Sequence, residues 1–390
     1  MRLLFLLPRI NLELVRGDCI YLKRFMEALT EKNEVHAIAH GSSEKIKVHS
    51  PGKFQLFERL YTAPYINYLK LKKLNELLKK EKYDFVFDQQ MICYGDNLWY
   101  KLPALFNRGN SLHSIIQKRI LKKNGLRIAY SFFGLTERDS FASFFAGETR
   151  QIHLKQLKEA DAIIVLSKRQ QELLEKDGIK NNFIVFYPSI DTKKFNRKKD
   201  CSYIKKKFGL KGFNLILVPA SNPFPELNEF FPVLSKTRKE INLVVTCSES
   251  KELKELAEKF GLKERVKFVG QVRESGDLIP LLSFCNAGVY LKKFGMPIGD
   301  ASTAVKISEY MACGLSVLVP EMPGPIEQGG KAGIVLDGKA VERINELYNN
   351  LSLRKRLSLK AREKALKEFD LKKNAKKLSK FLENIAVEKR

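Results

Sequence analysis

The sequence predicts an α/β protein built from two doubly wound domains, and three observations support this fold class. The chain has 390 residues, enough for two domains with separate hydrophobic cores. Short apolar runs alternate with amphipathic segments, which is typical of strand–helix–strand units around a parallel sheet. The alternation stops near residues 187–195 and gives way to a polar run at 196–200, which suits a linker. We therefore expect one domain over residues 1–195 and a second over residues 200–370.

The first domain begins with a strand, a loop containing Gly17 and a helix, the usual opening of a doubly wound sheet. The apolar run that starts at Met1 is too short for a secretory signal core and stops at Pro8, so it is predicted to be a buried strand. No run approaches the roughly 20 apolar residues of a membrane-spanning helix. The predicted strands are residues 3–7, 35–39, 85–87, 128–130 and 162–166, and the predicted helices are residues 20–32, 68–80 and 152–159.

The second domain repeats this alternation with six apolar runs. After Asp337 the pattern is helical to the end of the chain. The predicted strands are residues 215–218, 243–245, 266–269, 288–290, 317–319 and 334–336.

The charge is strongly positive, with 70 lysines and arginines against 44 acidic residues and a net charge of +26. The basic residues are spread over both halves, so anionic, phosphate-bearing partners are favoured in general. The sequence has no zinc-finger spacing, RNP-like aromatic motif or heptad-linked basic region, which argues against nucleic acid as the partner. The six cysteines form no C-x-x-C pair and the histidines no cluster, so we predict neither disulfides nor a metal site and expect a reducing, cytoplasmic setting.

The segment from Lys306 to Gly314 is the most informative one in the chain. It places the lysine and Glu309 on one face of a short helix that the glycine ends. Apolar runs at 286–291 and 315–319 flank this segment, so the helix is predicted to be the crossover of a strand–helix–strand unit. In open parallel sheets such helices begin beside the ligand crevice. A solvated surface ion pair with the same spacing is the alternative.

Several segments in order resemble those of GT-B glycosyltransferases of family 4, the group 1 type. The resemblance is carried by Glu309-Tyr-Met-Ala-Cys-Gly-Leu-x-Val, preceded by Thr303-Ala-Val-Lys306 and followed by Gly324-Pro-Ile-Glu327. Supporting pieces are Ala160-Asp161, residues 188–195 and residues 266–270. The resemblance implies the GT-B architecture, two Rossmann-like domains facing across a cleft, with a C-terminal helix in residues 371–390 that returns to the first domain.

The resemblance also implies an enzyme that moves a sugar from a nucleotide diphosphate sugar to an acceptor hydroxyl. It implies retention of configuration, no metal and no cofactor beyond the nucleotide sugar itself. In the family, the glutamate that matches Glu309 binds the ribose hydroxyls. Lys306 lies in the first helical turn and is expected to be catalytic, contacting the departing diphosphate, with Thr303 in the same donor-binding segment.

Two loops are expected to complete the site. Gly17, in the loop after the first strand, permits close approach of the backbone to the diphosphate or the sugar, and an ordinary turn glycine is the alternative. Asp18 is the second catalytic candidate, since its carboxylate can orient an acceptor hydroxyl, and capping of the following helix is the alternative. Ser221 and Asn222, after the first strand of the second domain, are assigned to donor binding.

Three departures from the family pattern leave a second interpretation open, a GT-B-fold binding or partner protein without transfer activity. The family's Gly-Arg and nearby Lys are missing, its first glutamate is replaced, and its first-domain histidine is absent. Sugar-phosphate or nucleotide-sugar epimerases share the architecture, but they do not explain the Glu309 segment. The positions concerned are Val218–Asn222 with Glu226, Ala301 or Lys292, and Phe132-Phe133 with His113 and His153 as the nearest substitutes.

Residues 108–127 form a basic amphipathic stretch. No acidic residue lies between Asp96 and Glu137, and apolar residues recur at helical spacing. In GT-B enzymes that act on lipid-linked acceptors, the first domain often rests on an anionic membrane through such a surface. We therefore expect a lipid-linked or cell-surface glycan acceptor and a peripheral position at the inner face of the membrane, and a helix packed within the domain is the alternative.

Overall fold

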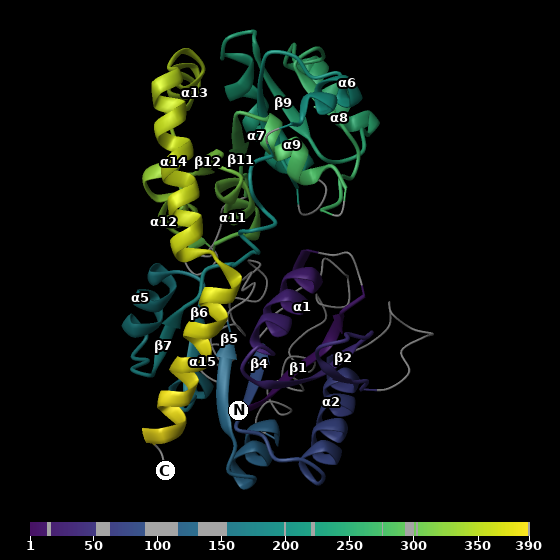
Figure 1. Ribbon diagram of the computed structural model, residues 1–390, viewed down its shortest axis with the longest axis vertical. Helices are drawn as coiled ribbons and strands as arrows, with labels where there is room; N and C mark the ends of the chain where they lie inside the picture. The colour runs from purple at the N-terminus through teal and green to yellow at the C-terminus, as the bar shows by residue number, and fades with distance from the viewer. Residues whose placement is uncertain are drawn as a thin grey trace, which may run out of the picture. The chain divides into compact units, whose positions relative to one another are not determined.

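The chain divides into two compact units, which are described separately. The computed structural model describes residues 1–13, 17–51, 63–89, 116–131, 154–198, 200–219, 223–274, 276–292, 300–301 and 303–388. The first unit holds Met1–Phe186 with Lys372–Arg390, and the second holds Tyr187–Phe294 with Asp300–Leu371 (Figure 1). The boundary precedes the predicted linker because Ile190 and Phe195 are buried in the core of the second unit.

The first unit contains a seven-stranded parallel sheet in the order β3-β2-β1-β4-β5-β6-β7. All five strands predicted for this part of the chain are present. The sheet also contains β3 and β7, three-residue strands at its two edges that are too short to show a periodic pattern. The strands are β1 (Arg2–Asn11), β2 (Glu34–His40), β3 (Lys47–His49), β4 (Phe85–Gln89), β5 (Arg127–Ser131), β6 (Ala162–Val165) and β7 (Phe183–Val185).

Helices cover the first sheet by burying apolar side chains. One face packs on Leu74, Leu121, Leu157 and Leu174, which come from four different helices. On β1, Phe5 packs edge-on against the Phe25 ring at a centroid distance of 6.0 Å. The helices are α1 (Gly17–Leu29), α2 (Ala63–Leu78), α5 (Lys168–Lys176) and α15 (Leu371–Glu388), with further helical segments at 116–123 and 154–158.

The C-terminal helix α15 packs on the first unit. Buried Ser379 accepts a 2.9 Å hydrogen bond from the side-chain amide of Asn33, just before β2. The Arg127 guanidinium donates to the backbone oxygen of Ala386 at 3.0 Å. Apolar burial of Leu378 and Leu382 adds to these contacts, so the end of the chain is an integral part of this unit.

The second unit contains a six-stranded parallel sheet in the order β10-β9-β8-β11-β12-β13. Alternate residues of β8 face opposite sides: Leu215 and Leu217 pack in one core cluster and Ile216 in the other. Both sheets therefore have the doubly wound order, which reverses at β1 and β4 in the first unit and at β8 and β11 in the second. The strands are β8 (Phe213–Leu217), β9 (Ile241–Val245), β10 (Val266–Phe268), β11 (Ala287–Val289), β12 (Ser316–Pro320) and β13 (Gly333–Leu336).

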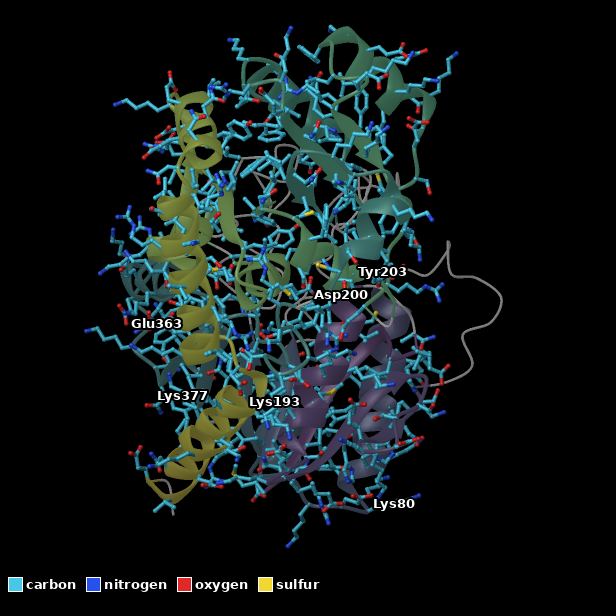
Figure 2. The ribbon with its side chains drawn as sticks, turned by 45° about the horizontal axis from the view of Figure 1, so that its top comes forward. Lys80, Lys193, Asp200, Tyr203, Glu363 and Lys377 are labelled. Atoms are coloured by element: carbon cyan, nitrogen blue, oxygen red, sulfur yellow. The ribbon has the colours of Figure 1, made fainter. Side chains whose placement is uncertain are left out.

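The helices of the second unit connect its parallel strands, and helices follow its last strand, as the pattern after Asp337 predicts. Exposed lysines occur on both units, with Lys80 and Lys377 on the first and Lys193 on the second (Figure 2). The helices are α6 (Ser202–Phe208), α7 (Phe224–Ser235), α8 (Lys251–Lys259), α9 (Leu278–Phe284), α11 (Val305–Ala312), α12 (Pro323–Gly329), α13 (Ala340–Asn349) and α14 (Leu351–Glu368).

Candidate functional site

Helix α11 connects β11 to β12 at the carboxyl end of β11, where open α/β sheets bind ligands. Its residues from Ile307 to Ala312 are buried. Gly314 ends it with a φ of +72°, and the N–H of Leu315 bonds to the carbonyl of Tyr310 at 3.0 Å. The short helix ended by a glycine is therefore present as predicted.

Lys306 and Glu309 form an ion pair in which Lys306 Nζ lies 3.0 Å from Glu309 Oε2. The Glu309 side chain is only 5% exposed, whereas that of Lys306 is 26% exposed. A solvated surface pair does not fit this burial, because an almost buried carboxylate carries a desolvation cost that only a specific partner offsets. A carboxylate held in this way can accept hydrogen bonds from neighbouring hydroxyl groups of a ligand.

Tyr310 ties α11 to the ends of two strands. Its hydroxyl accepts a 2.8 Å hydrogen bond from the N–H of Val218 and donates to the carbonyl of Val289 at 3.3 Å. The ring is fully buried, and this burial raises the pKa of Tyr310 far above its ordinary value, so the hydroxyl remains a neutral donor. Gly288 makes room for the ring, since a Cβ there would lie 2.4 Å from it.

Gln328 on α12 holds Ala304, the residue that directly precedes α11. Its amide accepts from the N–H of Ala304 and donates to the carbonyl of the same residue, both at 2.8 Å. The same amide nitrogen donates to Ser308 Oγ at 2.9 Å, and Ser308 in turn donates to the carbonyl of Pro188 at 2.5 Å. These contacts of Gln328 with Ala304 and Ser308 are called the Gln328 clamp below. Thr303, the residue before Ala304, is buried. The sequence did not single out Gln328, although it directly follows the Gly324-Pro-Ile-Glu327 segment.

Two charged residues lie near the carboxyl ends of β8 and β11. Lys292 follows β11, and burial lowers the pKa of Lys292 while the Asp300 carboxylate opposes that effect. Glu226 lies in the first turn of α7, and its Oε2 is buried with no hydrogen-bond partner among the residues the structure describes. Burial, with a smaller effect of the Glu226 carboxylate, raises the pKa of Tyr290 to about 12. Lys292 thus places an amine after β11, beside the strand end of β8 where the Arg and Lys of the family pattern are missing.

The remaining predicted positions are only partly covered. Gly17 is the first residue of α1 and Asp18 the second, after the segment that follows β1, but their side chains lie outside the description. Ser221, Asn222, His113 and His153 fall outside the described residues. Ala301 is fully buried. Among the predicted positions that the structure describes, it brings together Thr303, Lys306 and Glu309 at the entrance and on one face of α11.

The described part of the basic stretch is a packed helix at 116–123. Leu121 is fully buried and Ile120 packs against the same core, whereas Ile116 is 37% exposed. Lys118 and Lys122 both pair with Glu159, the latter at 2.7 Å, and they lower the pKa of Glu159 to about 2. The rest of the stretch, 108–115, is outside the described ranges. No helix among the described residues is long and apolar enough to cross a membrane.

Two parallel sheets, each with the doubly wound order, define the GT-B class, and solved structures share this fold over almost the whole chain. Sucrose-phosphate synthase from Thermosynechococcus elongatus matches with a TM-score of 0.73 at 14% identity, covering 99% of both chains. HepE from Anabaena in complex with UDP and glucose matches with a TM-score of 0.70 at 16% identity, covering 98% of this chain and 100% of that one. The lipopolysaccharide outer core galactosyltransferase WaaB matches with a TM-score of 0.65 at 13% identity, covering all of both chains. The predicted GT-B fold is confirmed.

The family model of glycosyl transferases group 1 matches residues 224–365, which lie within the second unit. This match confirms the predicted resemblance to glycosyltransferases of group 1, and it includes α11 with Lys306 and Glu309. No curated protein sequence matches the chain. Residues 224–365 of the second unit are therefore similar to the domain of glycosyl transferases group 1, and this similarity supports the prediction of an enzyme.

Proposed function

We propose that this enzyme transfers a sugar from a nucleotide diphosphate sugar to an acceptor hydroxyl, with retention and without a metal ion. The observation that carries the proposal is the pairing of Lys306 with the almost buried Glu309 on α11, within the segment that matches the family. The complex of HepE with UDP and glucose supports a uridine nucleotide as the first donor to test.

In the proposed mechanism, each group of the site has a separate task. Glu309 accepts hydrogen bonds from the ribose hydroxyls, because a carboxylate has about four acceptor sites and the bond from Lys306 occupies one of them. Lys306, at the N-terminal turn of α11, stabilises the charge that develops on the leaving diphosphate, and the dipole of the helix adds to this effect. Lys292, after the neighbouring strand β11, is a second amine that can donate hydrogen bonds to phosphate oxygens. The Gln328 clamp keeps the first turn of the helix in place while charge develops.

Calorimetry with UDP, GDP, ADP and dTDP sugars tests the donor assignment. Glu309→Gln should weaken binding of the preferred donor by about 1–3 kcal/mol, since charge-assisted hydrogen bonds are lost without a core cavity. Glu342→Gln, an exposed position on α13 in the same unit, is the matched control and should bind as the wild type does. Equal donor binding by wild type and Glu309→Gln would remove Glu309 from the site.

Metal independence is tested by measuring sugar transfer in the presence of EDTA. Transfer should continue in EDTA, because Lys306, Lys292 and the N-terminus of α11 take the place of a divalent ion in the proposed mechanism. Activity that returns only on addition of magnesium or manganese would contradict this part of the proposal.

A binding or partner protein without turnover is the second candidate, and Glu226 favours it. A carboxylate in the first turn of α7 repels a diphosphate, where the family has basic residues. Donor binding without any transfer, to water or to a range of acceptors, would support this candidate. Measured turnover would exclude it.

We further propose a lipid-linked or cell-surface glycan precursor as acceptor, with a peripheral position at the cytoplasmic face of the membrane. Arg119 and Lys123 are exposed on the helix at 116–123, and Lys122 is exposed beside them. The described cysteines are free thiols, which suits a reducing compartment. Because the apolar side of this helix is packed, the attraction to the membrane would be electrostatic and sensitive to salt.

A further inference from the structure

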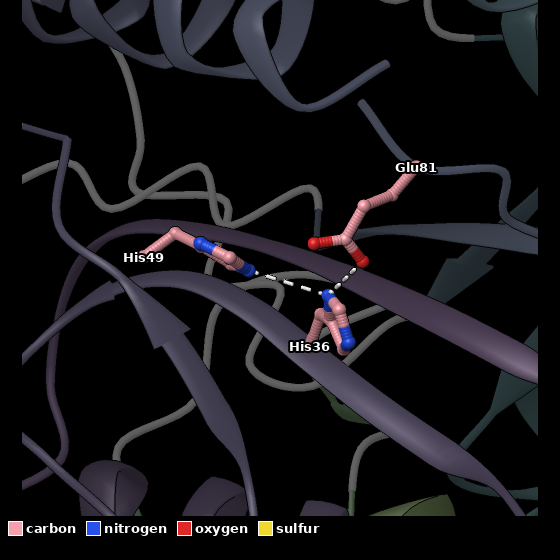
Figure 3. A group of neighbouring side chains, drawn as sticks. All are labelled: His36, His49 and Glu81. Carbon is pink, nitrogen blue, oxygen red and sulfur yellow. Dashed lines mark hydrogen bonds and ion pairs between the residues drawn. The ribbon is translucent and has the colours of Figure 1, made fainter. Parts of the chain in front are cut away.

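Three side chains with metal-ligating atoms converge at one edge of the first sheet (Figure 3). His36 lies on β2, His49 on the edge strand β3, and Glu81 in the segment between α2 and β4. Their ligating atoms all lie within 4.8 Å of one another. The sequence predicted no histidine cluster, because these residues are separated by 13 and 32 positions and meet only through the pairing of β2 with β3 and the turn into β4.

The spacing of these atoms matches that of ligands around one ion. His36 Nδ1 lies 3.2 Å from His49 Nε2 and 3.3 Å from Glu81 Oε2. Two atoms that each lie about 2.1 Å from an ion at the tetrahedral angle are about 3.4 Å apart. Two imidazoles and one carboxylate form a donor set that Zn²⁺ accepts. We propose that His36, His49 and Glu81 bind a divalent transition-metal ion of the Zn²⁺ type.

The surroundings of His36 orient its ring for this role. The side chain is fully buried, and its Nε2 lies 2.8 Å from Glu34 Oε1. Because an ionised carboxylate can only accept, the ring carries a hydrogen on Nε2, and in the neutral ring Nδ1 keeps its lone pair. A carboxylate on the far nitrogen of a metal-bound histidine is the usual arrangement in zinc sites. The Tyr83 hydroxyl lies 2.8 Å from Nδ1 and also interacts with the Glu81 carboxylate.

Neighbouring cations leave one oxygen of Glu81 accessible. Lys47 Nζ lies 2.7 Å from Oε1, the other oxygen, and its side chain is 56% exposed. The Arg2 guanidinium is 3.8 Å from Oε2, beyond hydrogen-bond distance. Both cations repel a metal ion, and the negative charge of Glu34 partly offsets this repulsion. Binding also requires neutral histidines, so affinity should fall at acidic pH.

The position of the cluster indicates a structural role. His36 is the third residue of β2 and Glu81 precedes β4, so two of the three ligands lie towards the amino ends of the strands, while His49 is the last residue of the three-residue edge strand β3. Ligands of open α/β sheets bind at the carboxyl ends. A metal ion here would tie the three-residue strand β3 and the turn into β4 to β2. This inference does not depend on the proposed transfer reaction.

Calorimetric titration of the chelator-treated full chain with Zn²⁺ tests the site. One equivalent should bind, and His49→Ala and Glu81→Gln should each weaken binding at least about tenfold. Glu76→Gln, a 48% exposed carboxylate on α2, is the control and should bind as the wild type does. Absence of saturable binding by the wild type, or unchanged binding by His49→Ala, would overturn the proposal.

Two further measurements keep the test decisive if a variant folds poorly. Glu34→Gln leaves the three ligands in place and should lower affinity about 10- to 100-fold by releasing the His36 ring. Co²⁺ in the wild type should give the visible absorption of a tetrahedral site without a thiolate charge-transfer band. A strong thiolate band would show that cysteines bind the ion instead, and would also overturn the proposal.

Discussion

The two units have the same order over six strands, but the polar clusters described above, one in each unit, lie towards different ends of their sheets. In the second unit, Glu309, Gln328 and Ser308 are buried around α11, beside the carboxyl end of β11. In the first unit, His36 is buried at the amino end of β2. A buried polar group is costly unless it has a partner, so its location indicates where a fold has been adapted to a task. The two clusters fit the two proposals made above, donor binding beside β11 and a structural metal ion beside β2.

The largest expected effect tests how rigidly the second unit holds its edge. Gly288→Ala places a Cβ 2.4 Å from the Tyr310 ring, so the ring and α11 must shift. We expect a loss of about 2–3 kcal/mol in the free energy of unfolding, measured by urea denaturation. Gly276→Ala, whose Cβ would meet its nearest neighbour at 3.6 Å, is the control and should change stability by less than about 0.5 kcal/mol. Equal stability of the two variants would show that α11 is not held by this packing.

Tyr310→Phe tests the hydrogen bonds of the same ring. The variant removes the acceptor of the Val218 N–H in a buried setting, so we expect a loss of about 1–3 kcal/mol in unfolding free energy. Tyr203→Phe removes a bond to Asp277 from a side chain that is 48% exposed and should cost much less. A loss in Tyr310→Phe no larger than in this control would break the argument that polar burial organises the edge.

The parts of the fold that depend on local patterns could be predicted from the sequence. The strand–helix alternation and the glycine at position 314 predict the sheets and α11 because both depend on local patterns. The short strands β3 and β7 carry too few residues for a pattern, and Gln328 bonds to backbone groups that any sequence offers. The His36 cluster depends on strand pairing, which a single sequence does not specify. Of the predicted donor residues, Ser221 and Asn222 lie outside the described part, so their roles stay predictions.

A smaller effect concerns the acid stability of the first unit. Because Lys118 and Lys122 lower the pKa of Glu159 to about 2, its contribution is present above the ordinary carboxylate pKa near 4.5 and is lost as the pH falls towards 2. Because the Glu159 side chain is 30% exposed, we expect its contribution to the free energy of unfolding to be about 1 kcal/mol. Glu159→Gln should therefore flatten the stability curve between pH 5 and about 2, measured by thermal unfolding. Glu172→Gln, at a 54% exposed position, should keep the curve of the wild type.

The smallest expected effect is membrane association. Arg119→Gln with Lys123→Gln should reduce sedimentation with anionic vesicles at low salt, since each charge contributes about 1 kcal/mol near a negative surface. Lys205→Gln with Lys206→Gln, exposed on α6 of the second unit, removes the same charge and should have no effect. Sedimentation that is equal in both double variants would assign the attraction to net charge. A wild type that stays in the supernatant would make a soluble acceptor the better proposal.

The central claim is that Lys306 acts on the departing diphosphate, and comparing turnover with donor affinity in Lys306→Ala tests it most directly. Loss of a charge that acts mainly in the transition state should lower kcat by about 100-fold or more while the donor Kd changes by less than about threefold. Lys331→Ala, at an exposed position in the same unit, should match the wild type in both quantities. An equal loss of affinity and turnover in Lys306→Ala would show that the lysine only positions the donor, and an unchanged kcat would contradict the account.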